Sequence, residues 1–282
     1  MRPGTVFYKM SGSGNDFIMF DGRHTSAEEL TRETIVALCD RRMGIGADGV
    51  GLLEPSEPDT AFRFRFWNRD GSVGPMCGNG ALCATRLAVI LEFAGPEAEI
   101  RFATPAGLHR GRVVGGRSEV ALPDCPAPKA APDVRTLPGE NSPTLVRPSV
   151  PHLVQTVDDV ETVAVAVRGP VLRSDPATGD GGANVNWVSP KGDGSWKMRT
   201  FERGVEGETL ACGTGAVASA LTLAGRALVK SPARIWTRSG LPLDVSFDFG
   251  TSTASSIRLA GEGRLVYRGL TGSLPTDCPN DT

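Results

Sequence analysis

Two stretches of sequence decide the fold: CGNGALCATRLAV (77–89) and CGTGAVASALTLA (212–224). Each begins with a cysteine and a glycine-rich turn, and each continues as a run of helix-forming residues. Apolar residues would lie on nearly every side of both helices, which is typical of a helix surrounded by sheet. The two cysteines are 212 − 77 = 135 residues apart. The pair therefore indicates one unit present in two copies.

The same offset of 135 residues recurs elsewhere in the chain. GIGADGVGLLEP (44–55) aligns with GDGGANVNWVSP (179–190) at that offset. Several matches at one offset predict an internal duplication. Asn68 and Arg203 are also 135 apart, so the repeat predicts that they occupy equivalent points.

Hydrophobic periodicity predicts the secondary structure of both copies. Alternating apolar and polar residues predict half-buried strands at 17–20, 61–67, 195–201 and 264–270. Helices are predicted over 27–42, 81–93 and 216–229. The order strand, glycine turn, helix recurs at corresponding places. The predicted fold class is therefore α/β, in two pseudo-symmetric domains.

A proline-rich segment lies near the middle of the chain. Between Pro123 and Pro151 there are eight prolines in 29 residues, which predicts irregular chain crossing between domains. A long surface loop is the alternative. The predicted domains are 1–122, completed by a C-terminal strand at about 262–274, and 123–261.

Composition excludes several classes of protein. The 282 residues are 40% hydrophobic and carry a net charge of −2, which argues against nucleic acid or a membrane surface as the main partner. The opening MRPGTVFYKMSG lacks the apolar segment of a signal peptide. The most apolar stretch, 216–229, is too short to span a bilayer. Six cysteines without a secretory signal indicate reduced thiols in a cytoplasmic protein.

The two cysteine turns carry the candidate chemistry. A cysteine before the first turn of a helix lies beside unpaired N–H groups and the positive end of the helix dipole, which lower a thiol pKa. The same N–H groups can hold a substrate carboxylate, at Gly78, Asn79, Gly213 and Thr214. The alternative is two buried structural cysteines in tight turns.

Two thiols from opposed domains suit racemisation of an amino acid. One face of the α-carbon must lose a proton and the other face must gain one, so one group begins as thiolate and the other as thiol. Two helix N-termini at the substrate carboxylate would stabilise the carbanion that develops.

Three motifs resemble those of the diaminopimelate epimerase family. They are KMSGSGNDF (9–17), NRDGS with MCGNG (68–80) and FERGVEGETLACGTGA (201–216). The resemblance runs from Lys9 to about Gly269. It implies a cofactor-independent isomerase of lysine and peptidoglycan synthesis, a possible homodimer, with mostly antiparallel sheets around each central helix and a site in the cleft between domains.

The resemblance also implies roles for individual residues. Cys77 and Cys212 become the acid–base pair, with Cys212 accepting the proton and Cys77 donating one in the LL-to-meso direction. His152 supports the thiols, and a surface histidine is the alternative. Substrate polar groups are contacted by Asn15, Asn68, Asn184, Glu202 and Arg203. Glu202 could polarise the substrate ammonium or form only a salt bridge with Arg203.

The chain departs from the family pattern at three points. Val150 stands where many members have asparagine before Pro-His, Gly49 where some have glutamine, and Leu82 where arginine is frequent. These departures bear on the substrate more than on the reaction. A racemase of another amino acid is one alternative, although proline racemase typically has CGHG where this chain has Asn79. A non-catalytic binding or thiolate–metal protein is another.

Other motifs receive structural interpretations. Gly44, Gly46 and Gly49 form G-x-G-x-x-G, but a helix precedes it and a strand follows, the reverse of a dinucleotide site. No zinc site is expected, because neither cysteine motif has a CxxC partner or a nearby histidine. The remaining thiols are interpreted as core or incidental: Cys39 and Cys83 on helices, Cys125 and Cys278 in loop or tail.

Overall fold

The computed structural model describes residues 1–56 and 58–274 of the chain. The chain folds as two compact units. The first unit is Met1–Val120 together with the chain from Gly261 onward, and the second is Ala121–Ala260. Both contain strands and helices, so the mixed α/β class is confirmed.

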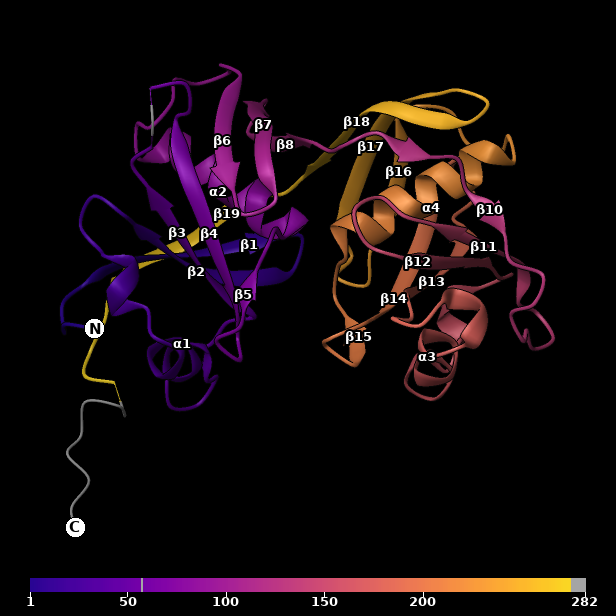
Figure 1. The fold of residues 1–282 in the computed structure, drawn as a ribbon, viewed down its shortest axis with the longest axis horizontal. Helices are drawn as coiled ribbons and strands as arrows, with labels where there is room; N and C mark the ends of the chain where they lie inside the picture. The colour runs from indigo at the N-terminus through magenta and orange to yellow at the C-terminus, as the bar shows by residue number, and fades with distance from the viewer. Residues whose placement is uncertain (57, 275–282) are drawn as a thin grey trace, which may run out of the picture. The chain divides into compact units, whose positions relative to one another are not determined.

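The first unit is built on strands from both ends of the chain. Its strands are β1 (Val6–Gly12), β2 (Asn15–Asp21), β3 (Gly49–Glu54), β4 (Phe62–Asn68), β5 (Val73–Gly74), β6 (Ile100–Thr104), β7 (Gly107–Val114), β8 (Arg117–Ala121) and β19 (Arg264–Leu270). Its helices are η1 (Ala27–Glu29), α1 (Arg32–Cys39) and α2 (Gly78–Ile90). Figure 1 shows β19, in yellow, beside the indigo β1.

The strands of the first unit form a mixed sheet around α2. Parallel pairs join β2 to β3 and β4 to β6. Antiparallel pairs join β1 to β19 and β2, β3 to β4, β4 to β5, β6 to β7, and β7 to β8. Helix α2 contacts β1, β2, β3, β4, β7 and β19. The apolar residues around this helix are thus buried on several sides, as the sequence predicts.

The second unit repeats most of the succession of elements of the first, with additional short strands and one additional short helix. Its strands are β9 (Cys125–Pro126), β10 (Lys129–Ala130), β11 (Asn141–Val146), β12 (His152–Thr156), β13 (Asn184–Pro190), β14 (Trp196–Glu202), β15 (Gly207–Thr209), β16 (Ala233–Trp236), β17 (Pro242–Phe249) and β18 (Thr253–Gly261). Its helices are η2 (Val160–Thr162), α3 (Val165–Arg173), η3 (Pro176–Thr178) and α4 (Gly213–Gly225).

Strand pairing in the second unit repeats that of the first. Parallel pairs join β12 to β13 and β14 to β16. Antiparallel pairs join β10 to β11, β11 to β12, β13 to β14, β14 to β15, β16 to β17, and β17 to β18. Helix α4, drawn in orange among the strands of this unit in Figure 1, contacts β11, β12, β13, β14, β16 and β17. Most of its residues are buried.

The repeat holds at 135 residues in most elements but not in β14. Phe17 pairs with Gly49 in the first unit, and His152 with Asn184 in the second, a shift of 135 on both strands. Trp67, however, corresponds to Phe201, because the two residues pair with Val50 and Val185, which are 135 apart.

This register corrects the predicted equivalence of Asn68 and Arg203. Strand β4 ends at Asn68, whereas β14 ends at Glu202, so Asn68 corresponds to Glu202. Arg203 lies one residue beyond the strand. The hairpin before β14 is shorter and the turn after it longer, and together these changes restore the offset of 135 at the cysteines.

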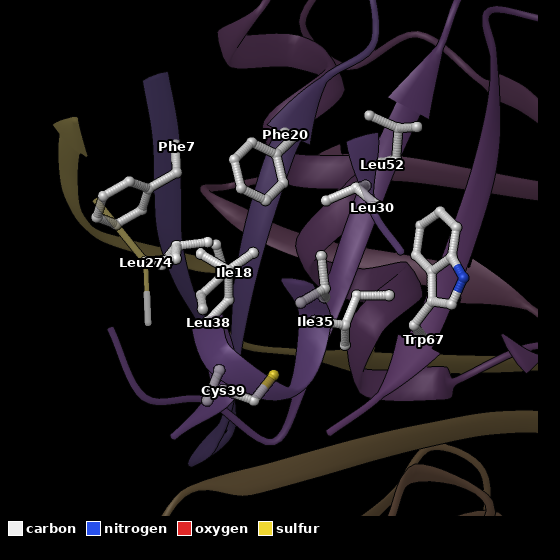
Figure 2. Packing of buried hydrophobic residues seen from close by; sticks show 12 residues of the cluster. Phe7, Ile18, Phe20, Leu30, Ile35, Leu38, Cys39, Leu52, Trp67 and Leu274 are labelled. Atoms are coloured by element: carbon white, nitrogen blue, oxygen red, sulfur yellow. The ribbon is translucent and has the colours of Figure 1, made fainter. Parts of the chain in front are cut away.

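A hydrophobic cluster holds α1 against the sheet of the first unit. Figure 2 shows Ile35 and Leu38 of α1 gathered with Ile18 and Phe20 of β2, and Leu274 joins them from the end of the described chain. Each such side chain contributes about 1.5–3 kcal/mol when it is fully buried. A corresponding cluster in the second unit includes Leu153, Val185, Leu172 and Phe201.

The prediction of one continuous helix over 27–42 is wrong, because the segment forms two separate helices, η1 and α1. Ser26 caps the short helix η1 by accepting from Glu28 N–H at 3.2 Å. Thr31 then accepts from Thr34 N–H at 3.3 Å and starts α1 as a separate helix. Two successive N-caps therefore break the predicted helix, because each cap residue has extended backbone angles.

The proline-rich segment is more regular than predicted. Pro143 lies inside β11, at a point where the pairing register shifts between Asn141 and Thr144. Such a bulge accommodates a residue that has no N–H for the ladder. Cys125, predicted in a loop, lies on strand β9 and is completely buried.

Within the described chain, no helix combines the length and the apolar character needed to cross a bilayer.

Candidate active site

Cys77 begins helix α2 and caps it. Its backbone is extended, with φ −129° and ψ 121°, and its Sγ accepts from Gly80 N–H at 3.4 Å. A cysteine here takes the place of the usual serine or aspartate cap. A Cβ on Gly80 would lie 3.3 Å from the Cys77 Cβ, so the turn is close-packed against the thiol.

Cys212 has nearly the same geometry at the start of α4. Its φ and ψ are −127° and 112°, and its Sγ accepts from Gly215 N–H at 3.3 Å. A Cβ on Gly215 would lie 2.5 Å from Asn186 Oδ1, which restricts this position to glycine. The predicted placement of both cysteines at helix N-termini is therefore confirmed.

The first turns of the two helices are suited to an anion. Both α2 and α4 are described over their full length, and neither carries an acidic side chain in its first turn. The N–H groups of a first turn have no partner within the helix, and the dipole favours negative charge there. A carboxylate is one of the anions that helix N-termini bind, together with phosphate and sulfate.

A buried histidine contacts the residue beside Cys212. His152, on β12, is completely buried, and its Nε2 lies 3.0 Å from Thr214 Oγ1. Thr214 Oγ1 in turn lies 3.6 Å from Cys212 Sγ. The three side chains thus form a chain of contacts that ends at the thiol, and the alternative of a surface histidine is wrong.

The neighbours of His152 define its tautomer. Asn186 Nδ2 donates to Leu153 O at 3.2 Å, and Asn186 Oδ1 accepts from Thr200 Oγ1 at 2.9 Å, so the orientation of this amide is settled. Asn186 Nδ2 therefore also donates to His152 Nδ1, at 3.0 Å. The ring proton lies on Nε2 and is donated to Thr214 Oγ1. The Thr214 hydroxyl can then donate its own proton to Cys212 Sγ.

The imidazole is neutral at physiological pH. Burial lowers the pKa of His152 to about 3, and the charge of Arg203 adds to that shift. A neutral ring keeps the single Nε2 proton on which the contacts to Thr214 and Cys212 depend.

The turn after β14 lies next to this histidine. Arg203 N–H donates to Asn184 Oδ1 at 2.7 Å, and the Asn184 amide nitrogen lies 3.4 Å from His152 Nε2. Arg203 Nη1 donates to Gly181 O at 3.2 Å. In the second unit, one network of contacts thus joins five of the predicted residues, namely Cys212, Thr214, His152, Asn184 and Arg203. Glu202, at the end of β14, accepts from Thr209 Oγ1 at 2.5 Å.

The first unit gathers a second set of predicted residues. Asn15 begins β2, and its Oδ1 lies 3.4 Å from Nδ2 of Asn79, in the first turn of α2. Asn15 Nδ2 donates to Asp48 Oδ2 at 2.7 Å. Asn68 pairs with Gly49 across the sheet, and its Nδ2 donates to Ser72 Oγ at 3.0 Å.

Comparison with known proteins identifies the family from both halves of the chain. The family model described as diaminopimelate epimerase matches residues 7–116 and 144–254. The chain belongs to the diaminopimelate epimerase family. It is 44% identical over 275 residues to the diaminopimelate epimerase of Gemmatimonas aurantiaca, covering 93% of this chain and 98% of that one. The Aquifex aeolicus diaminopimelate epimerase is 37% identical over 273 residues, with coverage of 93% and 96%.

Solved structures confirm the fold at greater distance. A crystal structure of a hydroxyproline epimerase from Agrobacterium vitis, with bound trans-4-hydroxy-L-proline, superposes with a TM-score of 0.72. The match covers 99% of this chain and 94% of that one at 17% identity. At that identity the likeness establishes the fold alone.

The departures from the diaminopimelate epimerase pattern have structural causes at two positions. A Cβ on Gly49 would lie 2.7 Å from both Phe66 Cε2 and Trp67 O, so β3 has no room there for a larger residue. Leu82 is completely buried in α2, where an arginine would leave a charge in the core. Nothing in the structure explains Val150, which is half-buried before Pro151.

Three other cysteines lie in the described part of the chain, and none of them caps a helix: Cys39 ends α1, Cys83 lies within α2, and Cys125 begins β9. Cys39 and Cys83 are buried, as predicted, and burial raises the pKa of Cys39 to about 12. Cys278 lies outside the described residues. Gly44 and Gly46 lie between α1 and β3, and Gly49 begins β3, so a helix precedes the glycines and a strand follows them, as predicted and in the reverse of the order at a dinucleotide site. Within the described residues, no group of three His, Cys, Asp or Glu side chains is placed to hold a metal ion.

Three side chains near the site do not appear among the sequence predictions. Asp48 holds Asn15, Asn186 sets the tautomer of His152, and Thr200 sets the orientation of Asn186. All three act through another side chain. The only signal for Asn186 is a polar residue within a buried strand, and Asp48 lies inside the GIGADG segment.

Proposed function

We propose that this chain interconverts LL- and meso-diaminopimelate by a two-base reaction of Cys77 and Cys212. One observation carries the proposal: both thiols cap helices at the same point of a repeated unit, and both accept from the N–H three residues later. In the proposed complex the two thiols act on opposite faces of one α-carbon. Membership of the diaminopimelate epimerase family supports the substrate.

The proton balance follows from two thiols of opposite protonation state. In the LL-to-meso direction the Cys212 thiolate takes the α-proton, and the electron pair of the broken C–H bond is left on the carbanion. The Cys77 thiol then donates its proton to the other face and becomes a thiolate. The two cysteines exchange protonation states in each turnover, and the reverse direction uses them in the opposite roles.

Two features of the site support this reaction. The first concerns the thiolate of Cys212, and the second concerns the charge of the carbanion. The Thr214 hydroxyl is oriented by neutral His152 so that it can donate to Cys212, which favours the thiolate there. The substrate carboxylate would lie between the N–H groups of the two first turns, at Gly78, Asn79, Gly213 and Thr214. Those groups stabilise the charge that the carboxylate gains as the carbanion forms.

The distal end of the substrate carries a second ammonium and carboxylate. In the proposed complex the Arg203 guanidinium binds that carboxylate with Asn68 and Asn184 as hydrogen-bonding partners, and Glu202 accepts from the ammonium. Val150 can form hydrogen bonds to the distal end of the substrate only through its backbone. A racemase of a less polar amino acid is the second candidate, and the apolar side chain of Val150 is the observation that favours it.

We also infer a homodimer as the working assembly. Strand β19 leaves Val266, Tyr267 and Leu270 46%, 45% and 66% exposed in the single chain. Tyr267 and Leu270 point to opposite faces of the strand, so the inference rests on Leu270, the most exposed of the three, as an apolar side chain that another subunit would cover. Leu270→Asp should convert a dimer to a monomer in light scattering. A wild-type protein that is already monomeric would contradict the inference.

The reaction is tested with LL-diaminopimelate in D2O. Formation of the meso isomer, with deuterium at the α-carbon, supports the proposal. Cys77→Ala and Cys212→Ala should each abolish epimerisation while thermal unfolding stays cooperative, and Cys39→Ala serves as the control thiol. Near-normal turnover by either active-site variant would contradict the two-base reaction. Exchange with a neutral amino acid but not with diaminopimelate would favour the second candidate.

A further inference from the structure

Four charged side chains form a network in the first unit: Lys9, Asp16, Arg41 and Asp48. Lys9 Nζ lies 2.6 Å from Asp16 Oδ2. Arg41 Nη2 donates to both carboxylates, at 2.7 Å to Asp16 Oδ1 and 2.8 Å to Asp48 Oδ1. Burial alone would raise the pKa of Asp16, but hydrogen bonds from Arg41 and Lys9 lower it below its ordinary value. Asp16 therefore stays ionised at neutral pH.

The network reaches the candidate site through Asp48 and Asn15. Asp48 Oδ2 accepts from Asn15 Nδ2 at 2.7 Å and from Asp16 N–H at 3.3 Å. On the other side, Asn15 Oδ1 lies 3.4 Å from Asn79 Nδ2, in the first turn of α2. The β1–β2 turn packs on the same helical turn, because a Cβ on Gly12 would lie 2.7 Å from Asn79 O. The Asn15 amide is thus held between the network and α2.

An asparagine amide has two orientations that differ by exchange of its oxygen and nitrogen. A carboxylate can only accept, so Asp48 requires the nitrogen of Asn15 on its own side and directs the oxygen to Asn79. We propose that Asp48, held by Arg41, is a positioning residue that sets the orientation in which Asn15 meets the substrate. This inference rests on the proposed function, in which Asn15 contacts diaminopimelate.

The second unit provides no copy of this arrangement. The residue 135 positions after Asp48 is Ala183, which is buried and apolar. Asn15 itself corresponds to Val150, so the second unit has no amide at this point. Its predicted site asparagine, Asn184, corresponds to Gly49 and is oriented by a backbone donor, since Asn184 Oδ1 accepts from Arg203 N–H at 2.7 Å. The nitrogen of the Asn15 amide is bound by Asp48, whereas the oxygen of the Asn184 amide is bound by Arg203 N–H. Asn15 therefore has its oxygen available for a further contact, and Asn184 its nitrogen.

Asp48→Asn changes the group that orients the Asn15 amide while keeping the size of the side chain at position 48. The new amide has the size of the carboxylate but offers a donor as well as an acceptor, so Asn15 is free to take both orientations. Asn15 contacts substrate in the ground state and the transition state alike, so its loss of orientation should appear in KM. We expect KM for diaminopimelate to rise roughly tenfold, with kcat within about twofold of wild type.

Glu119→Gln is the matched control in the same unit. Glu119 accepts from Arg112 Nη2 at 3.0 Å through both carboxylate oxygens, so the variant likewise converts an arginine-bound carboxylate to an amide. Neither Glu119 nor Arg112 belongs to the site, and this variant should leave KM and kcat unchanged. A KM increase shared by both variants would overturn the proposal, because it would reflect a general loss of charge.

A double-mutant cycle tests whether Asp48 acts through Asn15. Asp48→Asn should add little to the KM of Asn15→Ala, since the amide to be oriented is already gone. Additive effects, or an unchanged KM in Asp48→Asn alone, would overturn the positioning role.

The Asn15 side-chain amide resonance gives a readout that needs no activity. It should shift in Asp48→Asn and not in Glu119→Gln, and an unshifted resonance would overturn the proposal. A shift in an enzyme without epimerase activity would uphold the positioning role and reject the proposed function.

Discussion

His152 Nε2 lies 3.0 Å from the hydroxyl of Thr214, and the two residues belong to different elements, β12 and the first turn of α4. The contact links a strand of the buried sheet to the helix turn that carries Cys212. It also separates the two cysteine motifs chemically, because the position of Thr214 is taken by Asn79 in the first unit and that of His152 by Phe17. A duplicated unit has thus diverged around two similar thiols.

Thr214→Val should raise the pKa of the Cys212 thiol. The valine keeps the branched shape but removes the hydroxyl that can donate to the thiolate, a bond worth about 1.5–3 kcal/mol, or about one to two pH units. The pH dependence of iodoacetamide alkylation, followed at Cys212 by peptide mass spectrometry in a Cys77→Ala background, measures this change. Thr214→Ser keeps the hydroxyl and should titrate like the parent. An unshifted profile in Thr214→Val would exclude the hydroxyl as a donor to the thiolate.

His152 should make the protein less stable as the pH falls below about 6.5. The unfolded chain protonates this imidazole near its ordinary pKa, whereas burial keeps the folded pKa at about 3. The unfolded state therefore binds more protons between these two values, and the free energy of unfolding falls with pH by about 1.4 kcal/mol per unit. Between pH 6.5 and pH 5 the loss is about 2 kcal/mol.

Urea unfolding at pH 7.5, 6.5 and 5.0 measures this loss in wild type and in His152→Gln. The glutamine does not titrate, so its stability should change much less over the same interval. Parallel pH dependence in the two proteins would show that another group is responsible.

Arg203→Met should lower kcat/KM for diaminopimelate by roughly 30- to 150-fold. An arginine can bind a carboxylate through two charge-assisted hydrogen bonds, and losing them costs about 2–3 kcal/mol. The variant should lose much less activity toward an amino acid with a neutral side chain, if one is accepted. Arg234→Met is the control, because Arg234 binds Asp244 on the surface of the same unit at 2.7 Å. An equal loss of kcat/KM toward both substrates would show that Arg203 does not bind the distal carboxylate.

Gly49→Ala should destabilise the protein by about 1–3 kcal/mol, as expected when a methyl group is forced into a close-packed site. The added Cβ would meet Phe66 and the Trp67 carbonyl at 2.7 Å. Gly95→Ala is a control in the same unit, since a Cβ there has nothing within 4 Å. The free energy of unfolding in urea compares the two variants. Equal stability would mean that β3 can move away from β4, and glutamine would then be acceptable at position 49.

The sequence pattern predicts the helices around the two cysteines well and the surface helix poorly. Helices α2 and α4 begin at Gly78 and Gly213, three residues before their predicted starts, because the glycine turn is itself the first helical turn. Apolar residues on nearly every side of both helices favour a buried helix. The segment 27–42 lacks such a constraint, so local capping by Ser26 and Thr31 decides its structure.

The residues that would meet substrate are visible in the sequence, whereas those that orient them are not. Cys77 and Cys212 stand out because the motif is repeated with its glycines. Asp48 and Asn186 act through single hydrogen bonds to partners 33 and 34 residues away in sequence. Only the register of neighbouring strands brings such partners together, and a pattern of apolar residues does not specify that register to one residue. The single-residue difference between β4 and β14 has the same origin.

The pairing of β1 with β19 has a consequence for how the chain folds during synthesis. Val6 pairs with Leu270, so the first unit acquires its last strand only after almost the whole chain has left the ribosome. The second unit, Ala121–Ala260, is continuous and is fully made earlier. We therefore expect the half that is translated later to be the first to reach its final structure, while the amino-terminal half waits with an uncovered edge at β1. Chaperone capture of nascent chains should accordingly be strongest before residue 270 emerges and should fall once β19 can join the sheet.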